Sequence, residues 1–193
     1  MYTGFSDGFV AALDRKTGTE QWTASVGEGT YPDLIAPALP LPAGGVIVGG
    51  YTEPLVYLDP ATRSPSWRIE AGSAAPSILV DEMLYHPGAD GKLRAIAART
   101  GELKWTWDSG TSGPLGKPTL TPQGILVGSS DSTMFLVDVA LGTTRWKLDV
   151  GVDLTGFVST PGVEGADFYA LSNGGKLYAL RGAAPGTKPA LPD

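Results

Sequence analysis

The sequence predicts an all-β protein made of repeated four-stranded antiparallel sheets, and two sets of recurring residues support this. A short apolar motif returns about every forty residues, starting at Val10, Leu55, Leu93, Met134 and Leu177. A tryptophan follows twelve residues after the start of each of the first four copies, as Trp22, Trp67, Trp105 and Trp146. Self-similarity at a period of this length is the signature of a repeat architecture.

The composition agrees with many short strands joined by tight turns. The 193 residues include 27 glycines and 16 prolines, which disfavour helices, and the chain has no collagen-like triplet period. A net charge of -6 disfavours partners rich in phosphate, such as nucleic acid or an anionic membrane. The absence of cysteine excludes disulfides and thiolate metal sites but does not select a compartment.

Each repeat contains four short segments rich in β-forming residues, which we name strands A to D in order. In the third repeat these are expected near Pro76–Val80, Met83–His86, Lys92–Ala97 and Leu103–Trp107. A proline beside strand A gives a second register mark with the same period, as Pro37, Pro76, Pro118 and Pro161. Two independent marks therefore share one period.

Turn residues occupy the connections between these strands. The B–C connection of the third repeat holds Asp90-Gly91, which supplies the positive φ of a tight hairpin. The C–D connection of the first repeat runs from Asp14 to Gly18, where the carboxylate can accept backbone hydrogen bonds and glycine can be left-handed. The second repeat has Arg63 in place of that glycine, and a left-handed non-glycine residue costs roughly 1–2 kcal/mol. That turn has either another shape or a strained backbone.

Four-stranded meanders repeated at this period predict a β-propeller, in which each sheet is a blade and neighbouring blades bury each other's faces. The recurring indoles are expected to fill the wedge between adjacent sheets rather than to form a shared ligand platform. A β-sandwich would not explain why the tryptophans and the prolines return together.

About four and a half blades are predicted. Three complete blades span residues 34–71, 74–110 and 116–151, and partial blades span residues 1–26 and 157–181. The first repeat begins within strand B and the last ends after strand C. Pro189 stands where a fifth tryptophan would fall, so residues 182–193 are expected to be a disordered proline-rich tail.

The strand count predicts that the chain is roughly the C-terminal half of a seven- or eight-bladed ring. An open arc and a small, irregularly closed ring are the alternatives. In half a ring, the end blades leave apolar faces uncovered, so the chain alone is expected to dimerise or precipitate.

These repeats resemble those of the PQQ-like, or quinoprotein-type, propeller family. The similarity covers residues 4–181, and its best examples are Leu177–Leu180 and the stretch from Asp14 through Thr17-Gly18 to Trp22. The quinone-dependent dehydrogenases of this family use a calcium ion with acidic and asparagine ligands, a catalytic aspartate and often a vicinal cysteine pair. This chain lacks cysteine, and its single asparagine, Asn173, lies in an Asn-Gly-Gly turn. The resemblance therefore implies the non-catalytic BamB-like branch, whose members serve outer-membrane protein assembly.

Few residues suggest chemistry. His86 is the single histidine and is expected to be a solvated residue at a strand end. Val26–Thr30 only begins like a dinucleotide-binding loop, and the segments at Asp108 and Asp131 lack the ligand pattern of a calcium loop. No catalytic, cofactor-binding or metal-binding residue is predicted, and no cofactor.

Two features remain as candidate binding elements. Trp105 and Trp107 share one face of a strand and are either extra packing or an exposed aromatic anchor for a protein. The insertion Tyr31–Ile35 is a long inter-blade loop, and such loops often carry specificity.

We expect a non-enzymatic scaffold or protein-binding propeller of the bacterial cell envelope or periplasm, which binds proteins through inter-blade loops or strand edges. A fragment of a PQQ-dependent dehydrogenase and the sensor domain of a larger receptor or kinase are the alternatives. Nucleic-acid binding and direct membrane insertion are not expected. The first eight residues lack the basic and apolar regions of a signal peptide.

Overall fold

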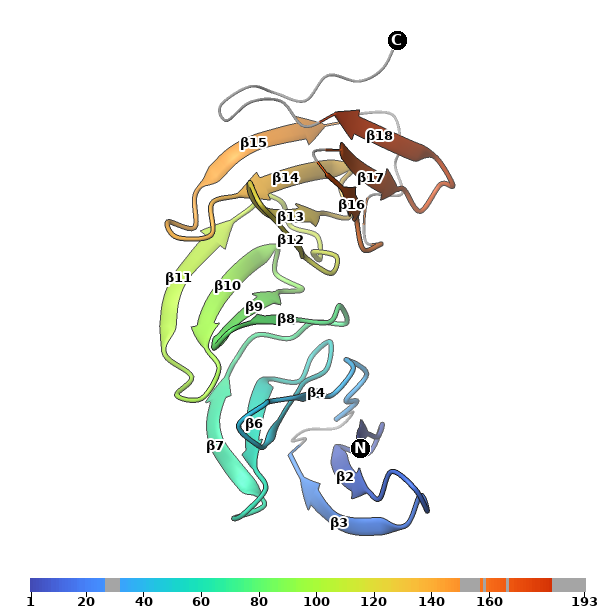
Figure 1. Cartoon of the computed structure of the whole chain (residues 1–193), viewed down its shortest axis with the longest axis vertical. Coiled ribbons are helices and arrows are strands. Elements are labelled where there is room, and N and C mark those ends of the chain that lie inside the picture. The colour runs from blue at the N-terminus through green and yellow to red at the C-terminus, as the bar shows by residue number, and fades with distance from the viewer. Residues whose placement is uncertain (27–31, 150–156, 158, 166, 182–193) are drawn as a thin grey trace. The chain divides into compact units, whose positions relative to one another are not determined.

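The computed structural model describes residues 1–26, 32–149, 157, 159–165 and 167–181 (Figure 1). The chain divides into two compact units. Unit 1 comprises Met1–Ala74 with Asp81–Met83 and Ala97–Glu102, and unit 2 comprises Ala75–Val80, Leu84–Ile96 and Leu103–Asp193.

The described residues form strands and turns, without a helix. The first sheet has the order β1 (Tyr2–Gly4), β2 (Phe9–Leu13) and β3 (Glu20–Ser25). The second has the order β4 (Leu39–Pro40), β5 (Val46–Val48), β6 (Leu55–Asp59) and β7 (Ser64–Ile69). Both lie in unit 1.

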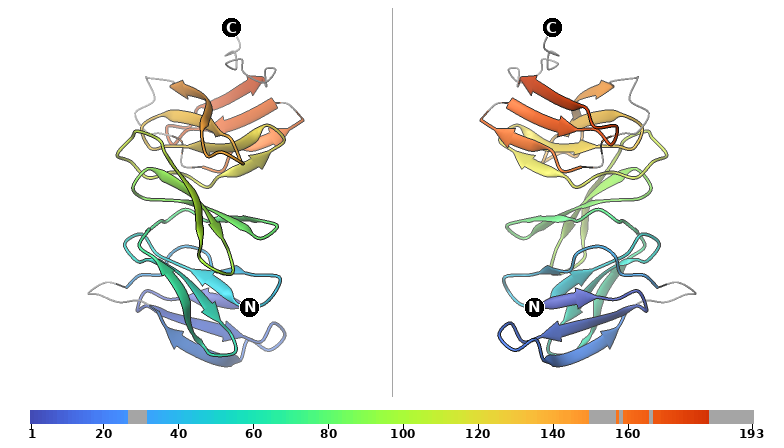
Figure 2. Two further views of the ribbon diagram at one scale, coloured as in Figure 1. Left: turned by 90° about the vertical axis from the view of Figure 1, so that its left-hand side faces the viewer. Right: turned by 90° about the vertical axis from the view of Figure 1, so that its right-hand side faces the viewer.

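The three later sheets repeat this plan. The third is β8 (Ile78–Val80), β9 (Met83–Pro87), β10 (Lys92–Ala97) and β11 (Leu103–Asp108). The fourth is β12 (Thr119–Thr121), β13 (Gly124–Gly128), β14 (Thr133–Val137) and β15 (Thr144–Asp149). The fifth is β16 (Gly162–Glu164), β17 (Asp167–Leu171) and β18 (Leu177–Arg181). Figure 2 shows the strands of each sheet side by side in a meander.

The predicted all-β repeat of four-stranded antiparallel sheets is confirmed. The third repeat has its four strands close to the predicted segments, although β8 begins at Ile78 rather than at Pro76.

The C–D turns form as the sequence predicts. The Asp14 carboxylate accepts hydrogen bonds of 2.8 Å from the amides of Lys16 and Thr17. The Asp138 carboxylate does the same, at 2.9 Å, with Ala140 and Leu141. The closing glycines have positive φ, with values of 72°, 72° and 61° at Gly18, Gly101 and Gly142.

Arg63 adopts the same left-handed turn without being a glycine. Its φ is 55°, and its amide donates to the Asp59 carbonyl oxygen at 2.7 Å. Gly101 makes the equivalent bond to Ala97 at 2.9 Å. Of the two alternatives that the sequence left open for this turn, the strained backbone is the one found.

Two of the repeating tryptophans dock on the C–D turn of the following sheet. The indole nitrogen of Trp67 donates to the Ala98 carbonyl oxygen at 3.1 Å. The indole ring lies so close to Gly101 that a Cβ there would be 2.6 Å from its Cγ. Trp105 repeats both contacts in unit 2, with Val139 and Gly142. The prediction that these indoles pack between adjacent sheets is confirmed at both positions.

The first tryptophan differs from these two. All three rings contact a tyrosine of their own sheet, and for Trp22 this is Tyr2 at a centroid distance of 5.9 Å. Among the described residues, however, the Trp22 indole nitrogen makes no hydrogen bond to the next C–D turn like those of Trp67 and Trp105. The next C–D turn carries Arg63 where the later turns carry Gly101 and Gly142. Since even a Cβ at those glycines would overlap the indole, Trp22 cannot approach Arg63 in the same way.

Each unit has an apolar core between successive sheets. In unit 1, the core joins the first two sheets through Val10, Val26, Leu34, Val46, Val48, Val56 and Leu58. In unit 2, a second core joins the last two sheets through Leu126, Met134, Leu136, Leu148, Phe157, Phe168, Ala170 and Leu180. Trp146 packs against this second cluster, in agreement with the sequence prediction.

The expected disordered tail at residues 182–193 and most of the loop Val26–Thr30 lie outside the described residues. The predicted blade boundaries and ring size remain predictions. In the described part of the chain, no helix has the length and apolar character needed to cross a bilayer.

Candidate functional site

One end of unit 1 collects the connections between strands B and C and those between successive sheets. Antiparallel strands alternate in direction, so B–C and D–A connections share one end, while the A–B and C–D turns share the other. We call the first the loop end, made of residues 5–8, 32–38, 49–54 and 70–73.

Backbone hydrogen bonds tie these loops to one another. The Leu34 amide donates to the Phe5 carbonyl oxygen at 3.3 Å, and the Ala36 amide donates to that of Gly49 at 3.3 Å. The Ser73 amide donates to the Gly50 carbonyl oxygen at 2.7 Å. The inter-blade loop thus lies between the hairpin of the first sheet and that of the second.

Close backbone approaches make glycine necessary at two of these positions. A Cβ on Gly50 would overlap the carbonyl oxygen of Asp33, and one on Gly72 would overlap that of Tyr51. These contacts fix the loops in place, so the side chains that they carry are presented from a defined backbone.

Three large apolar side chains of the loop end face solvent. Phe5 is 45% exposed, and Ile35 and Tyr51 are both 49% exposed. Leu34, which directly precedes Ile35 in the inter-blade loop, is buried in the unit 1 core. The loop therefore alternates an anchoring residue with a presented one.

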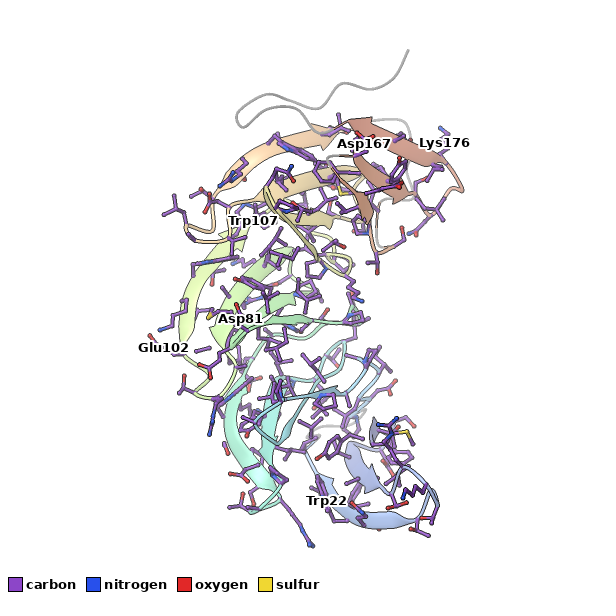
Figure 3. The ribbon with its side chains drawn as sticks, viewed as in Figure 1. Trp22, Asp81, Glu102, Trp107, Asp167 and Lys176 are labelled. Atoms are coloured by element: carbon purple, nitrogen blue, oxygen red, sulfur yellow. The ribbon has the colours of Figure 1, made fainter. Side chains whose placement is uncertain are left out.

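The aromatic pair on β11 is packing and not an exposed anchor. Trp107 is 4% exposed, and its ring meets Phe135 edge-on at a centroid distance of 4.9 Å. Its indole nitrogen donates to the Thr144 hydroxyl oxygen at 2.8 Å. Figure 3 labels Trp107 at the end of β11 beside β14. The anchor interpretation of Trp105 and Trp107 is therefore wrong, since both indoles are held by the fourth sheet.

The expectation that His86 is a solvated strand-end residue is also wrong. His86 is 3% exposed, and its Nδ1 lies 2.8 Å from the Ser77 hydroxyl oxygen. The last residues of β9 are buried by their neighbours, a tertiary effect that strand position alone does not reveal. A buried, hydrogen-bonded histidine of this kind is a structural residue.

The two acidic segments form turns, as predicted. Asp108 accepts a hydrogen bond from the Gly110 amide at 2.8 Å. Asp131 accepts from the Thr133 amide at 3.3 Å and from the Ser129 hydroxyl. Within the residues described, no three side chains of histidine, cysteine, aspartate or glutamate come together as a metal-binding group.

Three aspartates have a lowered pKa, and all three lie in turns. Hydrogen bonds from the Thr17 and Lys16 amides lower the pKa of Asp14. The Leu141 amide and the Arg145 guanidinium lower the pKa of Asp138. Burial opposes ionisation of Asp90, but its bond to Arg94 prevails and the pKa of this carboxyl is lowered. These carboxylates stabilise turns and have no feature of a general base.

The loop end is predicted in part from the sequence as Tyr31–Ile35, of which Tyr31 is not described. Phe5 and Tyr51 are not among the predicted residues. Each is an isolated aromatic residue beside a Gly-containing turn, and that is the one signal which could have identified them.

Sequence comparisons relate nearly the whole chain to known proteins. A family profile described as outer membrane protein assembly factor BamB matches residues 6–186. The outer membrane protein assembly factor BamB of Legionella pneumophila is 26% identical over 188 residues, which cover 93% of this chain and 48% of the relative. The protein of the same name from Salmonella typhimurium is 24% identical over 183 residues, which cover 92% and 46%.

A quinohemoprotein alcohol dehydrogenase of Comamonas testosteroni is 30% identical over 129 residues, which cover 56% of this chain and 18% of that enzyme. The chain thus spans about half the length of the two assembly factors and a smaller share of the dehydrogenase.

Solved structures give the same fold. The crystal structure of BamB from Moraxella catarrhalis matches with a TM-score of 0.72 at 22% identity, over 93% of this chain and 54% of that one. The computationally designed Ika8 protein also matches with a TM-score of 0.72, at 16% identity over 92% and 54%. At these identities the likeness concerns the fold, and the predicted propeller fold is confirmed.

Proposed function

Because this chain belongs to the PQQ-like repeat family described as outer membrane protein assembly factor BamB, we propose that it is a non-enzymatic scaffold of the bacterial cell envelope that binds other proteins. The single observation that carries this proposal is the family match over residues 6–186, which includes strands of all five sheets. The relatives from Legionella and Salmonella carry the same description.

The loop end of unit 1 supports a binding role. It presents Phe5, Ile35 and Tyr51 to solvent from loops that are tied together by backbone hydrogen bonds. Large side chains held on a rigid backbone bind a partner with little loss of conformational entropy. Loops on a stable repeat scaffold are also the usual place for such contacts.

A quinone-dependent dehydrogenase is the competing function, because the Comamonas enzyme is similar over part of the chain. The family resemblance implies that such enzymes need a calcium site with acidic ligands. The described residues do not bring three acidic, histidine or cysteine side chains together, and His86 is buried. The described residues therefore do not fit the quinone and its calcium ion.

A second contact surface lies on the fifth sheet. One of its faces holds Phe168 and Leu180 in the unit 2 core. On the other face, Leu171 pairs directly with Leu177 and both side chains are exposed. Apolar residues at this position are covered by a neighbouring sheet in a propeller, so the isolated chain should associate through them.

A chimeric assembly factor tests the proposed function. The chain would replace the matching half of the Salmonella relative in cells that lack their own copy, and the folded state of the chimera would be checked by circular dichroism. Restored yields of folded outer-membrane proteins are expected. A folded, abundant chimera that restores nothing would contradict the proposal, and calcium-dependent dye reduction after addition of the quinone would favour the dehydrogenase.

A further inference from the structure

The charge of the chain is divided very unevenly between its two units. Over the sequence, unit 1 contains five Lys and Arg residues against eleven Asp and Glu residues, whereas unit 2 contains nine of each. Unit 1 therefore carries the whole net charge of -6. A net negative charge on unit 1 favours the approach of cationic partners over anionic ones.

The basic residues of unit 1 gather at the end opposite the loop end. Four of the five lie in C–D turns, as Arg15, Lys16, Arg63 and Arg99. The fifth, Arg68, lies in β7 and forms an ion pair with Glu70 at 2.8 Å. No Lys or Arg occurs anywhere between Lys16 and Arg63 in the sequence.

The loop end, by contrast, carries acidic residues beside its exposed apolar side chains. Asp7 lies in the hairpin that follows Phe5, and Asp33 lies two residues before Ile35. Glu53 lies two residues after Tyr51 but is buried, with 5% exposure. In the part of the chain that the structure describes, no ion pair involves Asp7 or Asp33. Phe5 and Ile35 thus each have a carboxylate that reaches solvent within two residues in the sequence.

From this arrangement we propose that the loop end of unit 1 binds a cationic protein segment in which Lys or Arg side chains alternate with large apolar ones. The apolar residues of the segment would cover Phe5, Ile35 and Tyr51, and its cations would face Asp7 and Asp33. Complementary charge sets the orientation and speeds the encounter, while burial of the aromatic rings supplies most of the affinity. This inference rests on the proposed scaffold function and specifies the chemistry of its partner.

The first experiment uses two labelled peptides and the whole chain. In one peptide lysine alternates with phenylalanine and leucine, and in the other glutamate replaces lysine. Fluorescence anisotropy should show the lysine peptide binding at least about tenfold more tightly, with an affinity that falls as salt rises. Equal binding of the two peptides would overturn the inference.

Variants then locate the site. Replacing Phe5, Ile35 and Tyr51 together by serine should weaken binding of the lysine peptide at least about tenfold. The variant D7N/D33N should weaken it about threefold and flatten the salt dependence. Leu141→Ser is the matched control, because Leu141 is an exposed apolar residue on a turn of unit 2, and it should bind as the parent does.

Folding of each variant is checked by circular dichroism, and the single variant Tyr51→Ser replaces the triple one if the latter does not fold. A folded variant that binds the lysine peptide like the parent would overturn the inference. The chimera separates this result from the proposed function. If a chimera with the serine substitutions still restored assembly, the scaffold function would stand and the loop end would not be its binding surface.

Discussion

The indole nitrogen of Trp105 donates a 3.0 Å hydrogen bond to the carbonyl oxygen of Val139, in the turn between β14 and β15. The same indole lies against Gly142, which closes that turn with a φ of 61°. Trp67 makes the matching contacts with Ala98 and Gly101. At these two positions, one repeat apart, one tryptophan and one glycine join a D strand to the next C–D turn.

Gly142→Ala should destabilise the chain more than Gly18→Ala does. Both glycines are left-handed, so alanine at either position costs roughly 1–2 kcal/mol. At Gly142 the new Cβ would also lie 2.6 Å from the Trp105 ring, and such overpacking adds about 1–3 kcal/mol. No atom lies within 4 Å of the corresponding position at Gly18. The free energy of unfolding of both variants is measured in urea. Equal losses would show that the contact between Trp105 and Gly142 does not constrain the chain.

Arg63→Gly should stabilise the chain by about 0.5–1 kcal/mol. Relief of the left-handed strain gains roughly 1–2 kcal/mol, and the greater freedom of glycine in the unfolded chain removes part of that gain. Arg15→Gly is the control, since Arg15 is an arginine of the preceding C–D turn that does not have positive φ. It should destabilise the chain slightly. If urea unfolding showed that both variants lose stability, the left-handed backbone at Arg63 would not be strained.

His86→Ala should lower the stability by about 2–4 kcal/mol, because it empties a buried site and leaves the Ser77 hydroxyl without this partner. Ser77→Ala keeps the ring and should lose only about 1 kcal/mol. Binding of the lysine peptide should be unchanged in both, as expected for a structural residue. Thermal unfolding measures the stability of the variants, and fluorescence anisotropy measures their binding of the peptide. Loss of binding in a folded His86→Ala variant would show that this histidine has a functional role.

Acid should weaken the C–D turns. The pKa of Asp14 and Asp138 is lowered in the folded chain by hydrogen bonds from turn amides, so between the folded and unfolded values the unfolded state binds more protons. The contribution of these carboxylates is therefore complete above about pH 5 and is lost as the pH falls through the lowered values. Asp138→Asn retains the acceptor oxygen but not the charge. Its stability should change less than that of the parent between about pH 5 and pH 2 in urea titrations.

The isolated chain should form dimers or larger species. The exposed face of the fifth sheet carries Leu171 and Leu177 side by side, with exposed fractions of 48% and 68%. Light scattering after size exclusion should show association, and replacing both leucines by serine should reduce it, whereas Leu141→Ser should not. A parent chain that is a stable monomer would contradict this prediction.

The sequence predicts the repeated part of the fold well, for a physical reason. Turn conformations and strand pairing depend on residues a few positions apart, so Asp14, Gly18 and Trp105 reveal their roles through spacing alone. The burial of His86 and Trp107 depends on packing between segments distant in sequence, and both were predicted less well. The loop end is harder still, since the loops that carry Phe5, Ile35 and Tyr51 are joined only by backbone hydrogen bonds between segments distant in sequence.

Site-specific photocrosslinking in the chimera tests most directly whether this chain is a protein-binding scaffold. A photoreactive residue would replace Tyr51 at the loop end or, as the control, Leu141 on the β14–β15 turn. We predict that position 51 crosslinks to a protein of the outer-membrane assembly machinery through a cationic segment, and that position 141 does not. A folded chimera that crosslinks to no such protein from position 51, or equally from both positions, would contradict this account.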